Sequence, residues 1–378
     1  MSAEHTGSLG VTRTEVVRLF TEDEPLRLAS GRTLGPVDVA YETYGTLNAD
    51  ASNAVLVCHA LTGDAHAAGF HEGDKRPGWW DTLIGPGKPL DTDRFFVICS
   101  NLLGGCQGTT GPSSPRPDTG EPYGLDFPLV LMEDFVNVHR ALARHLGVGK
   151  LLAAIGGSMG GMQVLDWSLR YPEELANAII VAASSRLTAQ NIAFSAVARR
   201  AIVDDPDFRD GRYAAEGTSP DVGLAIARMM AHITYMSEDA LDEKFGRAYQ
   251  QQVRKPGFGI DFAVESYLDH QGQAFLARFD ALSYLYLTRS MDYFDPFAET
   301  PPRVRPDPVK YLVLSFDSDW RFDTEHSRRI VRHLERGRLP VTFRELSSPW
   351  GHDSFLLDND DYHATVRAYL DRALEVGL

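Results

Sequence analysis

Three residues, far apart along the chain, have the types and the order that nucleophilic catalysis by a serine hydroxyl requires. Ser158 lies in Gly156–Gly160, which has the pattern G-x-S-x-G. An acid, Asp319, and a histidine, His352, follow it along the chain. A serine hydroxyl is a weak nucleophile until an imidazole accepts its proton, and a carboxylate must hold that imidazole in the correct tautomer. The sequence therefore predicts a catalytic triad of Ser158, Asp319 and His352.

Other residues compete for two of these roles. Asp317 lies two residues before Asp319 and is a rival acid, whose alternative role is that of a solvated loop carboxylate. His59 and His66 follow an earlier apolar run and are rival histidines. The pattern G-x-S-x-G also occurs by chance in glycine-bearing turns. The prediction therefore depends on the order serine, acid, histidine rather than on the serine motif alone.

An oxyanion hole is the second requirement of this chemistry. The segment 59–63 follows an apolar run, and a backbone N–H in it, at Leu61, would face the reacting group together with the N–H of Met159. Met159 would begin a helix whose dipole favours negative charge at that end. For His59 the alternative role is structural, as a side chain that bonds this loop. We keep both interpretations of His59 open.

Short apolar runs indicate the elements that position these residues. Five of them have the length of a strand: Ala54–Cys58, Phe95–Cys99, Leu151–Ile155, Ala178–Ala183 and Tyr311–Phe316. Continuous apolar runs are typical of strands that are covered on both faces, as in a parallel sheet. A further strand is predicted over Val341–Leu346. Each triad residue follows one of these strands, where ligand sites of open α/β sheets form.

The remaining periodicity is helical. Met132–Leu146 has apolar residues at helical spacing and predicts a crossover helix, and Asp361–Leu374 predicts a closing helix. Residues 185–299 have helical periodicity and no comparable strand run, and the proline-rich stretch 301–308 ends them. The chain is thus predicted to be an α/β protein with a mostly parallel sheet and flanking helices. Its core domain spans 1–184 and 300–378, and a helical lid domain spans 185–299.

Composition excludes several classes of protein. The chain has 378 residues, of which 43% are hydrophobic, which is enough for a large core. Its formal net charge of -15 disfavours nucleic acid and anionic lipid as partners. Three cysteines cannot all pair, and none has the C-x-x-C spacing of a metal site. Residues 1–10 do not resemble a signal peptide, and no apolar run approaches the roughly 18 residues of a membrane span. We expect a cytoplasmic protein.

Several segments together resemble homoserine O-acetyltransferase, an acyltransferase family of the α/β-hydrolase superfamily. They are spread over nearly the whole chain: HALTG at 59–63, NLLGGCQGTTG at 101–111, GGSMGGMQ at 156–163, RMMAHITY at 228–235, SDW at 318–320 and GHDSF at 351–355. The combination of GGSMGGMQ and GHDSF is much more specific than G-x-S-x-G alone. The resemblance implies an α/β-hydrolase fold with an inserted helical lid. It also favours Asp319 over Asp317 as the acid.

The resemblance implies a two-step transfer. Ser158 would take an acetyl group from acetyl-CoA and pass it to L-homoserine, giving O-acetyl-L-homoserine for methionine biosynthesis. Arg228 would bind the homoserine carboxylate, Asp353 its amino group, and Tyr235 would line the pocket. Acetyl-CoA would be a co-substrate, with no metal or other cofactor. The lid helices would form the contact of a homodimer.

Alternatives to these roles stay open. Arg228 could be a solvated helix arginine, Asp353 a cap of the following turn, and Tyr235 a packed lid aromatic. The donor could be succinyl-CoA and the acceptor L-serine. An esterase of the same fold would share the triad, since a fold does not determine a function. A catalytically silent interaction protein is disfavoured because all three triad residues are present.

Overall fold

The computed structural model describes residues 7–250, 257–300, 302 and 306–378. Parts of the N-terminal stretch 1–10 and of the proline-rich stretch 301–308 therefore lie outside the described residues. Eight strands form the main sheet, in the order β1-β4-β8-β5-β9-β10-β11-β12. Their bounds are β1 Glu15–Phe20, β4 Val37–Tyr44, β5 Ala54–Cys58, β8 Phe96–Ser100, β9 Leu151–Gly157, β10 Leu175–Val181, β11 Lys310–Phe316 and β12 Val341–Leu346.

The prediction of a mostly parallel sheet is confirmed. The strands from β8 to β12 in the sheet order pair in parallel, whereas β1 pairs antiparallel with β4 and β4 pairs antiparallel with β8. All six predicted strands are present, each with at least one parallel neighbour, although β10 begins and ends earlier than the run 178–183. The antiparallel edge was not predicted, because Asp38 and Glu42 interrupt the apolar pattern of β4. Two short pairs complete the strands, β2 Leu26–Arg27 with β3 Thr33–Leu34, and β6 Ile84–Gly85 with β7 Leu90–Asp91.

Helices cover both faces of the sheet, so successive side chains of one strand enter different cores. Leu56 of β5 packs in the cluster that includes Leu142 and Leu334, whereas Val57 packs in the cluster that includes Val366. The first face is thus covered by α1 Met132–His145, α2 Met159–Arg170 and α10 Thr324–Arg336, and the second by α11 Asp360–Val376. This alternation explains why β5 is buried at all five positions.

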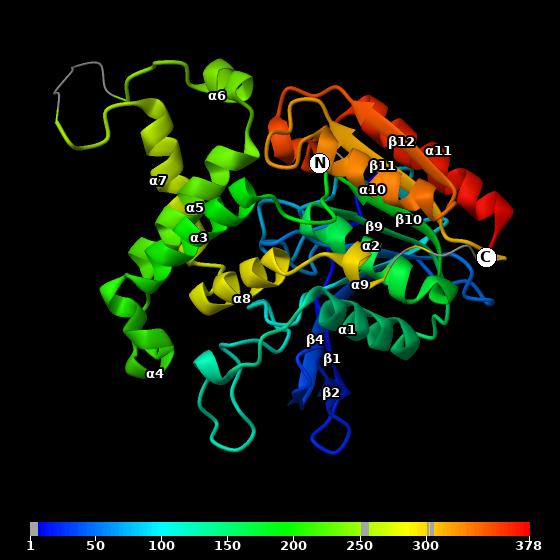
Figure 1. Cartoon of the computed structure of the whole chain (residues 1–378), viewed down its shortest axis with the longest axis horizontal. Coiled ribbons are helices and arrows are strands. Elements are labelled where there is room, and N and C mark those ends of the chain that lie inside the picture. The colour runs from blue at the N-terminus through cyan, green and yellow to red at the C-terminus, as the bar shows by residue number, and fades with distance from the viewer. Residues whose placement is uncertain (1–6, 251–256, 301, 303–305) are drawn as a thin grey trace.

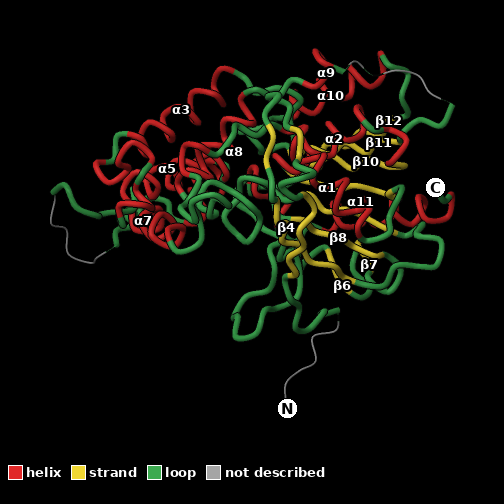
Figure 2. Tube along the Cα trace, turned by 90° about the horizontal axis from the view of Figure 1, so that it is seen from below, coloured by secondary structure: helices red, strands yellow, loops and turns green. Residues whose placement is uncertain are grey.

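Seven helices lie between β10 and β11 in the described part of the chain. They are α3 Ala189–Val203, α4 Tyr213–Glu216, α5 Asp221–Tyr235, α6 Glu238–Lys244, α7 Ala263–Leu276, α8 Ala281–Asp292 and α9 Pro296–Glu299. Both views place α3, α5 and α7 beside the sheet layer rather than on one of its faces (Figures 1 and 2). Short 3-10 helices occur at Gly124–Asp126, Pro172–Glu174, Pro206–Gly211 and Gly351–Leu356.

These helices agree with the helical character predicted for 185–299, and the division into core and lid domains stays a prediction. The sheet places the ends of β9, β11 and β12 in one row, because the three strands run parallel with only β10 between β9 and β11. The predicted triad residues follow these three strands. The fold therefore brings the carboxyl ends that carry them to the same edge of the sheet.

Candidate active site

Ser158 occupies a sharp turn between β9 and α2. Its backbone has φ of 57° and ψ of −122°, a region that residues with a side chain rarely adopt. Its N–H donates to the carbonyl of Val181, 2.9 Å away, which holds the turn against β10. A Cβ at Gly160 would lie 2.0 Å from the carbonyl oxygen of Cys58. Only glycine at 160 therefore allows the turn to approach β5 this closely.

The three predicted catalytic residues form a continuous chain of hydrogen bonds. The Oγ of Ser158 lies 2.8 Å from Nε2 of His352, and Nδ1 of His352 lies 2.7 Å from Oδ2 of Asp319. The side chains of His352 and Asp319 are only 3% and 0% exposed. Such burial strengthens the attraction between the carboxylate and an imidazolium. The geometry fits a serine whose proton passes to His352 while Asp319 fixes the ring.

The two rival acids have separate partners. Asp319 also accepts hydrogen bonds through Oδ1 from the N–H groups of Arg321 and Phe322, each at 2.9 Å. Asp317 instead accepts from the N–H of Ser348 at 3.0 Å. Asp317 therefore holds a neighbouring loop, and it is Asp319 that contacts the histidine. This distinction needed coordinates, because the two carboxylates lie only two residues apart.

Aromatic rings exclude water from His352. Phe322 and Phe355 meet the imidazole edge to face, with ring centroids 5.1 and 5.7 Å away. Trp80 donates from its indole nitrogen to the carbonyl of Phe355, at 2.7 Å. The ring of Phe355 also fills the space beside Gly157, where an added Cβ would lie 2.3 Å from it. These contacts fix the position of the imidazole relative to Ser158.

His59 has a structural part in the loop that follows β5. Its Nε2 accepts from the N–H of Leu102 at 3.1 Å, so its Nδ1 carries the proton and donates to the carbonyl of Ala60 at 2.7 Å. Burial lowers the pKa of this imidazole, which keeps it neutral. The structure thus agrees with the structural interpretation of His59. The oxyanion-hole roles of Leu61 and Met159, both buried beside this loop, stay predictions.

Arg228 and Tyr235, both on α5, face the triad. Arg228 donates from Nη1 to the hydroxyl of Thr62 at 3.2 Å, while its Nε is buried without a partner among the described residues. The ring centroid of Tyr235 lies 6.1 Å from that of His352 and 5.8 Å from the guanidinium of Arg228. Arg228 is therefore not a solvated helix arginine. A bound carboxylate would accept a hydrogen bond from the unpaired Nε of Arg228.

Asp353 follows His352 directly and carries a perturbed carboxyl group. Burial raises its pKa to about 6, although the charges of His352 and Arg228 oppose the shift. No hydrogen bond to its carboxylate is present within the described residues. A cap of the following turn would accept such a bond, so the structure does not show that role. Asp353 is half-buried, and a half-buried carboxylate without a hydrogen bond among the described residues is suited to a cationic ligand.

Two pocket residues were not predicted from the sequence. Thr62 bonds Arg228, and Arg321 donates from Nη1 to the hydroxyl of Thr234 at 2.7 Å. The guanidinium of Arg321 also lies 5.4 Å from the ring centroid of Tyr235. A signal was available for Arg321, because it follows the catalytic acid candidate by two residues. Thr62 lies in the segment 59–63 predicted to form the oxyanion hole, but its contact with Arg228 forms only where the loop and α5 meet in the folded chain.

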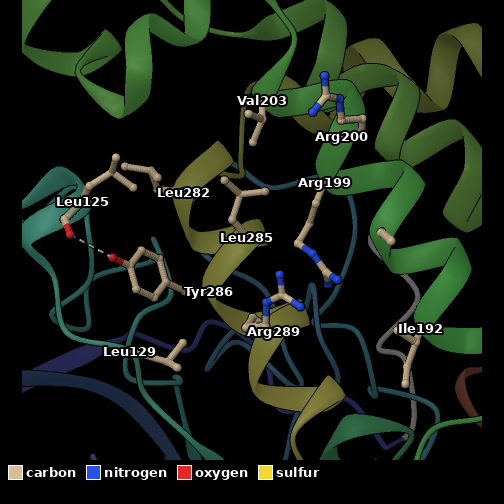
Figure 3. Close-up of a pocket in the computed structure, with 11 residues that line it drawn as sticks. Leu125, Leu129, Ile192, Arg199, Arg200, Val203, Leu282, Leu285, Tyr286 and Arg289 are labelled. Carbon is tan, nitrogen blue, oxygen red and sulfur yellow. Dashed lines mark hydrogen bonds between the residues drawn. The ribbon is translucent and has the colours of Figure 1, made fainter.

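An apolar cavity of about 500 Å³ lies away from these residues. Figure 3 shows Ile192 and Val203 of α3 and Leu285 of α8 around it, with Arg199 and Arg289 among the other residues drawn. None of the triad or pocket residues lines it. This cavity is therefore not the active site, which is identified by the hydrogen-bonded chain through His352.

We expect Asp319→Asn to reduce the rate at which Ser158 reacts with an activated ester by about 10⁴-fold, because an amide would favour the wrong imidazole tautomer. Release of nitrophenol from p-nitrophenyl acetate measures this rate. Asp317→Asn is the matched control, since an amide oxygen can still accept from Ser348, and it should leave the rate nearly unchanged. Equal losses in the two variants would refute the choice of Asp319.

Comparison with known proteins places this arrangement in a family. Residues 53–359 match the family model described as alpha/beta hydrolase fold. A homoserine O-succinyltransferase of Magnetococcus marinus is 56% identical over 97% of this chain and 96% of that protein. A homoserine O-acetyltransferase of Rhodopseudomonas palustris is 52% identical over 94% of this chain and 90% of that protein.

Solved structures agree with these sequence relatives. The crystal structure of homoserine O-acetyltransferase from Bacillus anthracis has a TM-score of 0.85 and 26% identity, over 96% of this chain and 99% of that one. The structure of esterase E22 has a TM-score of 0.84 and 30% identity, over 95% of this chain and 100% of that one. The fold thus accommodates both transfer and hydrolysis, and the sequence relatives distinguish them. The chain belongs to the α/β-hydrolase fold family and, within it, to the homoserine O-acyltransferases.

Proposed function

We propose that this chain transfers an acyl group from an acyl-CoA thioester to the hydroxyl of L-homoserine through an acyl-Ser158 intermediate. The observation that carries the proposal is the hydrogen-bonded chain from Ser158 through His352 to Asp319. It occurs in a chain about half identical to proteins named for homoserine acyl transfer. The sequence-based expectation of acetyl transfer agrees with the relatives named homoserine O-acetyltransferase.

In the first step, Ser158 attacks the thioester carbonyl while His352 accepts the hydroxyl proton. The imidazolium that forms faces Asp319, 2.7 Å away, which stabilises its charge. His352 then returns the proton to the departing thiolate of coenzyme A. Backbone N–H groups at Leu61 and Met159 would hold the developing oxyanion. The product of this step is a serine ester.

In the second step, homoserine must attack this ester before water does. Arg228 would hold its carboxylate through the donor that is otherwise unpaired, and Asp353 would hold its ammonium. His352, shielded by aromatic rings, would accept the proton of the attacking hydroxyl and return it to the oxygen of Ser158 as the ester bond to Ser158 breaks. Fixing both ends of the acceptor places its hydroxyl near the ester and raises its effective concentration over that of water.

The test of transfer against hydrolysis is release of free coenzyme A with and without homoserine. We expect continued release of coenzyme A to require homoserine as the acceptor. Water has neither the carboxylate that Arg228 would bind nor the ammonium that Asp353 would bind. A thiol reagent follows the release, and L-serine and L-homoserine are compared as acceptors. Release at the same rate without an acceptor would mean that the chain is an esterase.

The nature of the acyl group is a separate question, and one observation favours succinyl as a second candidate. The guanidinium groups of Arg228 and Arg321 lie 5.8 and 5.4 Å from the ring centroid of Tyr235. Neither arginine pairs with a carboxylate among the described residues. Homoserine offers one carboxylate, whereas a succinyl group would supply another. Two relatives that are 56% identical are named homoserine O-succinyltransferase.

Competition between acetyl-CoA and succinyl-CoA at equal concentration, with homoserine present, tests the donor. If the acyl group is acetyl, O-acetylhomoserine predominates and Arg321→Met changes the product ratio little. If it is succinyl, O-succinylhomoserine predominates in the wild type and is lost in Arg321→Met, because the second carboxylate loses its partner. Arg332→Met is a control, since Arg332 pairs with Glu325 on the exposed side of α10. Mass spectrometry of the products gives the ratio.

The raised pKa of Asp353 predicts a pH dependence of kcat/KM for homoserine. Because burial raises the pKa of its carboxyl to about 6, the group is charged above this pH and neutral below it. We expect kcat/KM for homoserine to fall below about pH 6 more steeply than the rate of Ser158 acylation, which does not require Asp353. Asp353→Asn should have low kcat/KM for homoserine and lack this difference. Parallel pH profiles for both steps in the wild type would contradict the role of Asp353.

The proposed homodimer through the lid helices has support from exposed apolar residues. Val197 and Val203 on α3 are 56% and 45% exposed, and Val222 and Ile226 on α5 are 70% and 43% exposed. Apolar side chains gathered on neighbouring helices are a common feature of subunit contacts.

In the described residues, no helix is both long enough and apolar enough to cross a bilayer. The cytoplasmic location and the absence of a catalytic cofactor stay predictions.

A further inference from the structure

Outside the active site, one group of described side chains has the composition of a metal site. Glu42 of β4 and two histidines of the loop after β5, His66 and His71, each offer one ligand atom within 4.8 Å of the others. Nδ1 of His66 lies 3.2 Å from Oε2 of Glu42, and Nε2 of His71 lies 2.7 Å from Oε1. The three residues come from two segments, so no sequence spacing reveals the group.

The ligand atoms lie close enough to converge on a small tetrahedral cation. Ligand atoms bound to Zn²⁺ at about 2.0–2.1 Å lie roughly 3.3 Å from one another. The two nitrogen-to-oxygen distances, 3.2 and 2.7 Å, involve different oxygens of Glu42, and the three ligand atoms all lie within 4.8 Å of one another, so the side chains would shift to reach this spacing around one cation. The two imidazoles are stacked, with centroids 3.7 Å apart, and both direct a nitrogen to the same carboxylate.

Surrounding groups support binding of a cation. The other nitrogen of His71 faces the exposed carboxylate of Asp74 at 3.9 Å, and a movement of Asp74 to hydrogen-bond distance would give the carboxylate–histidine–metal arrangement that orients metal ligands. The hydroxyl of Thr14 lies 2.8 Å from Oε1 of Glu42, where it or a water molecule would complete four ligands. The side chain of His71 is 35% exposed, which leaves a path from solvent. Imidazole and carboxylate together favour Zn²⁺ and its neighbours over Mg²⁺.

Glu42 lies buried among these partners. Its side chain is 1% exposed. Its oxygens accept hydrogen bonds from the hydroxyls of Thr14 and Tyr44 and contact the ring nitrogens of His66 and His71. A cation at this position would replace the direct contacts between the ring nitrogens and the carboxylate.

We propose that Glu42, His66 and His71 bind one Zn²⁺ ion, or another late first-row divalent cation, and thereby join β4 to the loop that carries Leu61 and Thr62. The site is separate from the triad and does not depend on the proposed acyl transfer. Tyr44 already links the same elements, since its hydroxyl donates to Glu42 at 2.9 Å and accepts from the N–H of Ala67 at 2.9 Å. The cation would stabilise this connection further.

Calorimetric titration of the EDTA-treated full chain with ZnCl₂ tests the proposal. We expect saturable binding of one equivalent, a rise in the unfolding temperature, and no such effect with MgCl₂. His71→Gln should weaken binding by at least about tenfold, because it removes a ligand. His145→Gln, which changes an exposed histidine of α1, is the matched control and should bind Zn²⁺ as the wild type does.

A second measurement covers the case in which a variant folds poorly. Co²⁺ added to the wild-type chain should develop the intense visible absorption of tetrahedral nitrogen and oxygen ligation, and Zn²⁺ should remove it. Circular dichroism checks that His71→Gln and Glu42→Gln are folded. Absence of one-equivalent binding in the wild type, or equal Zn²⁺ affinity in wild type and a folded His71→Gln, would overturn the proposal.

Discussion

The close approach of the turn at Ser158 to β5 is the constraint on which the active site depends. The turn requires a left-handed backbone at the serine and a hydrogen at the Cα of Gly160, which touches the carbonyl of Cys58. A strained residue of this kind costs on the order of 1–3 kcal/mol, which the surrounding contacts must offset. The strained turn places the Ser158 hydroxyl beyond the end of β9, at the start of α2, with its Oγ 2.8 Å from Nε2 of His352.

The remaining parts of the site are arranged around this hydroxyl by different layers of the fold. The parallel sheet supplies the acid and the histidine at neighbouring strand ends, and the aromatic rings of Phe322 and Phe355 keep the imidazole in place. The helical insertion contributes Arg228 and Tyr235 from α5. The catalytic chain therefore belongs to the strand ends of the sheet. The pocket that would select the acceptor combines these two residues of α5 with Thr62, Arg321 and Asp353 from loops that follow the strands.

Much of this could be predicted from the sequence, because continuous apolar runs identify doubly covered strands and G-x-S-x-G identifies the turn. The antiparallel edge escaped prediction, since Asp38 and Glu42 interrupt the apolar pattern of β4. The choice between Asp317 and Asp319 rested on resemblance, because both lie in one short turn and only the fold decides which faces His352. Contacts such as the hydrogen bond between Thr62 and Arg228 join segments far apart in the chain, so local sequence patterns do not predict them.

The mechanism requires that the Ser158 hydroxyl carry the acyl group between donor and acceptor. Mass spectrometry of the protein after brief exposure to acetyl-CoA or succinyl-CoA, without homoserine, detects this acyl group. We expect one acyl group on the peptide that contains Ser158, its loss when homoserine is added, and no modification of a Ser158→Ala variant. An acyl group on another residue, or undiminished turnover by Ser158→Ala, would refute transfer through Ser158.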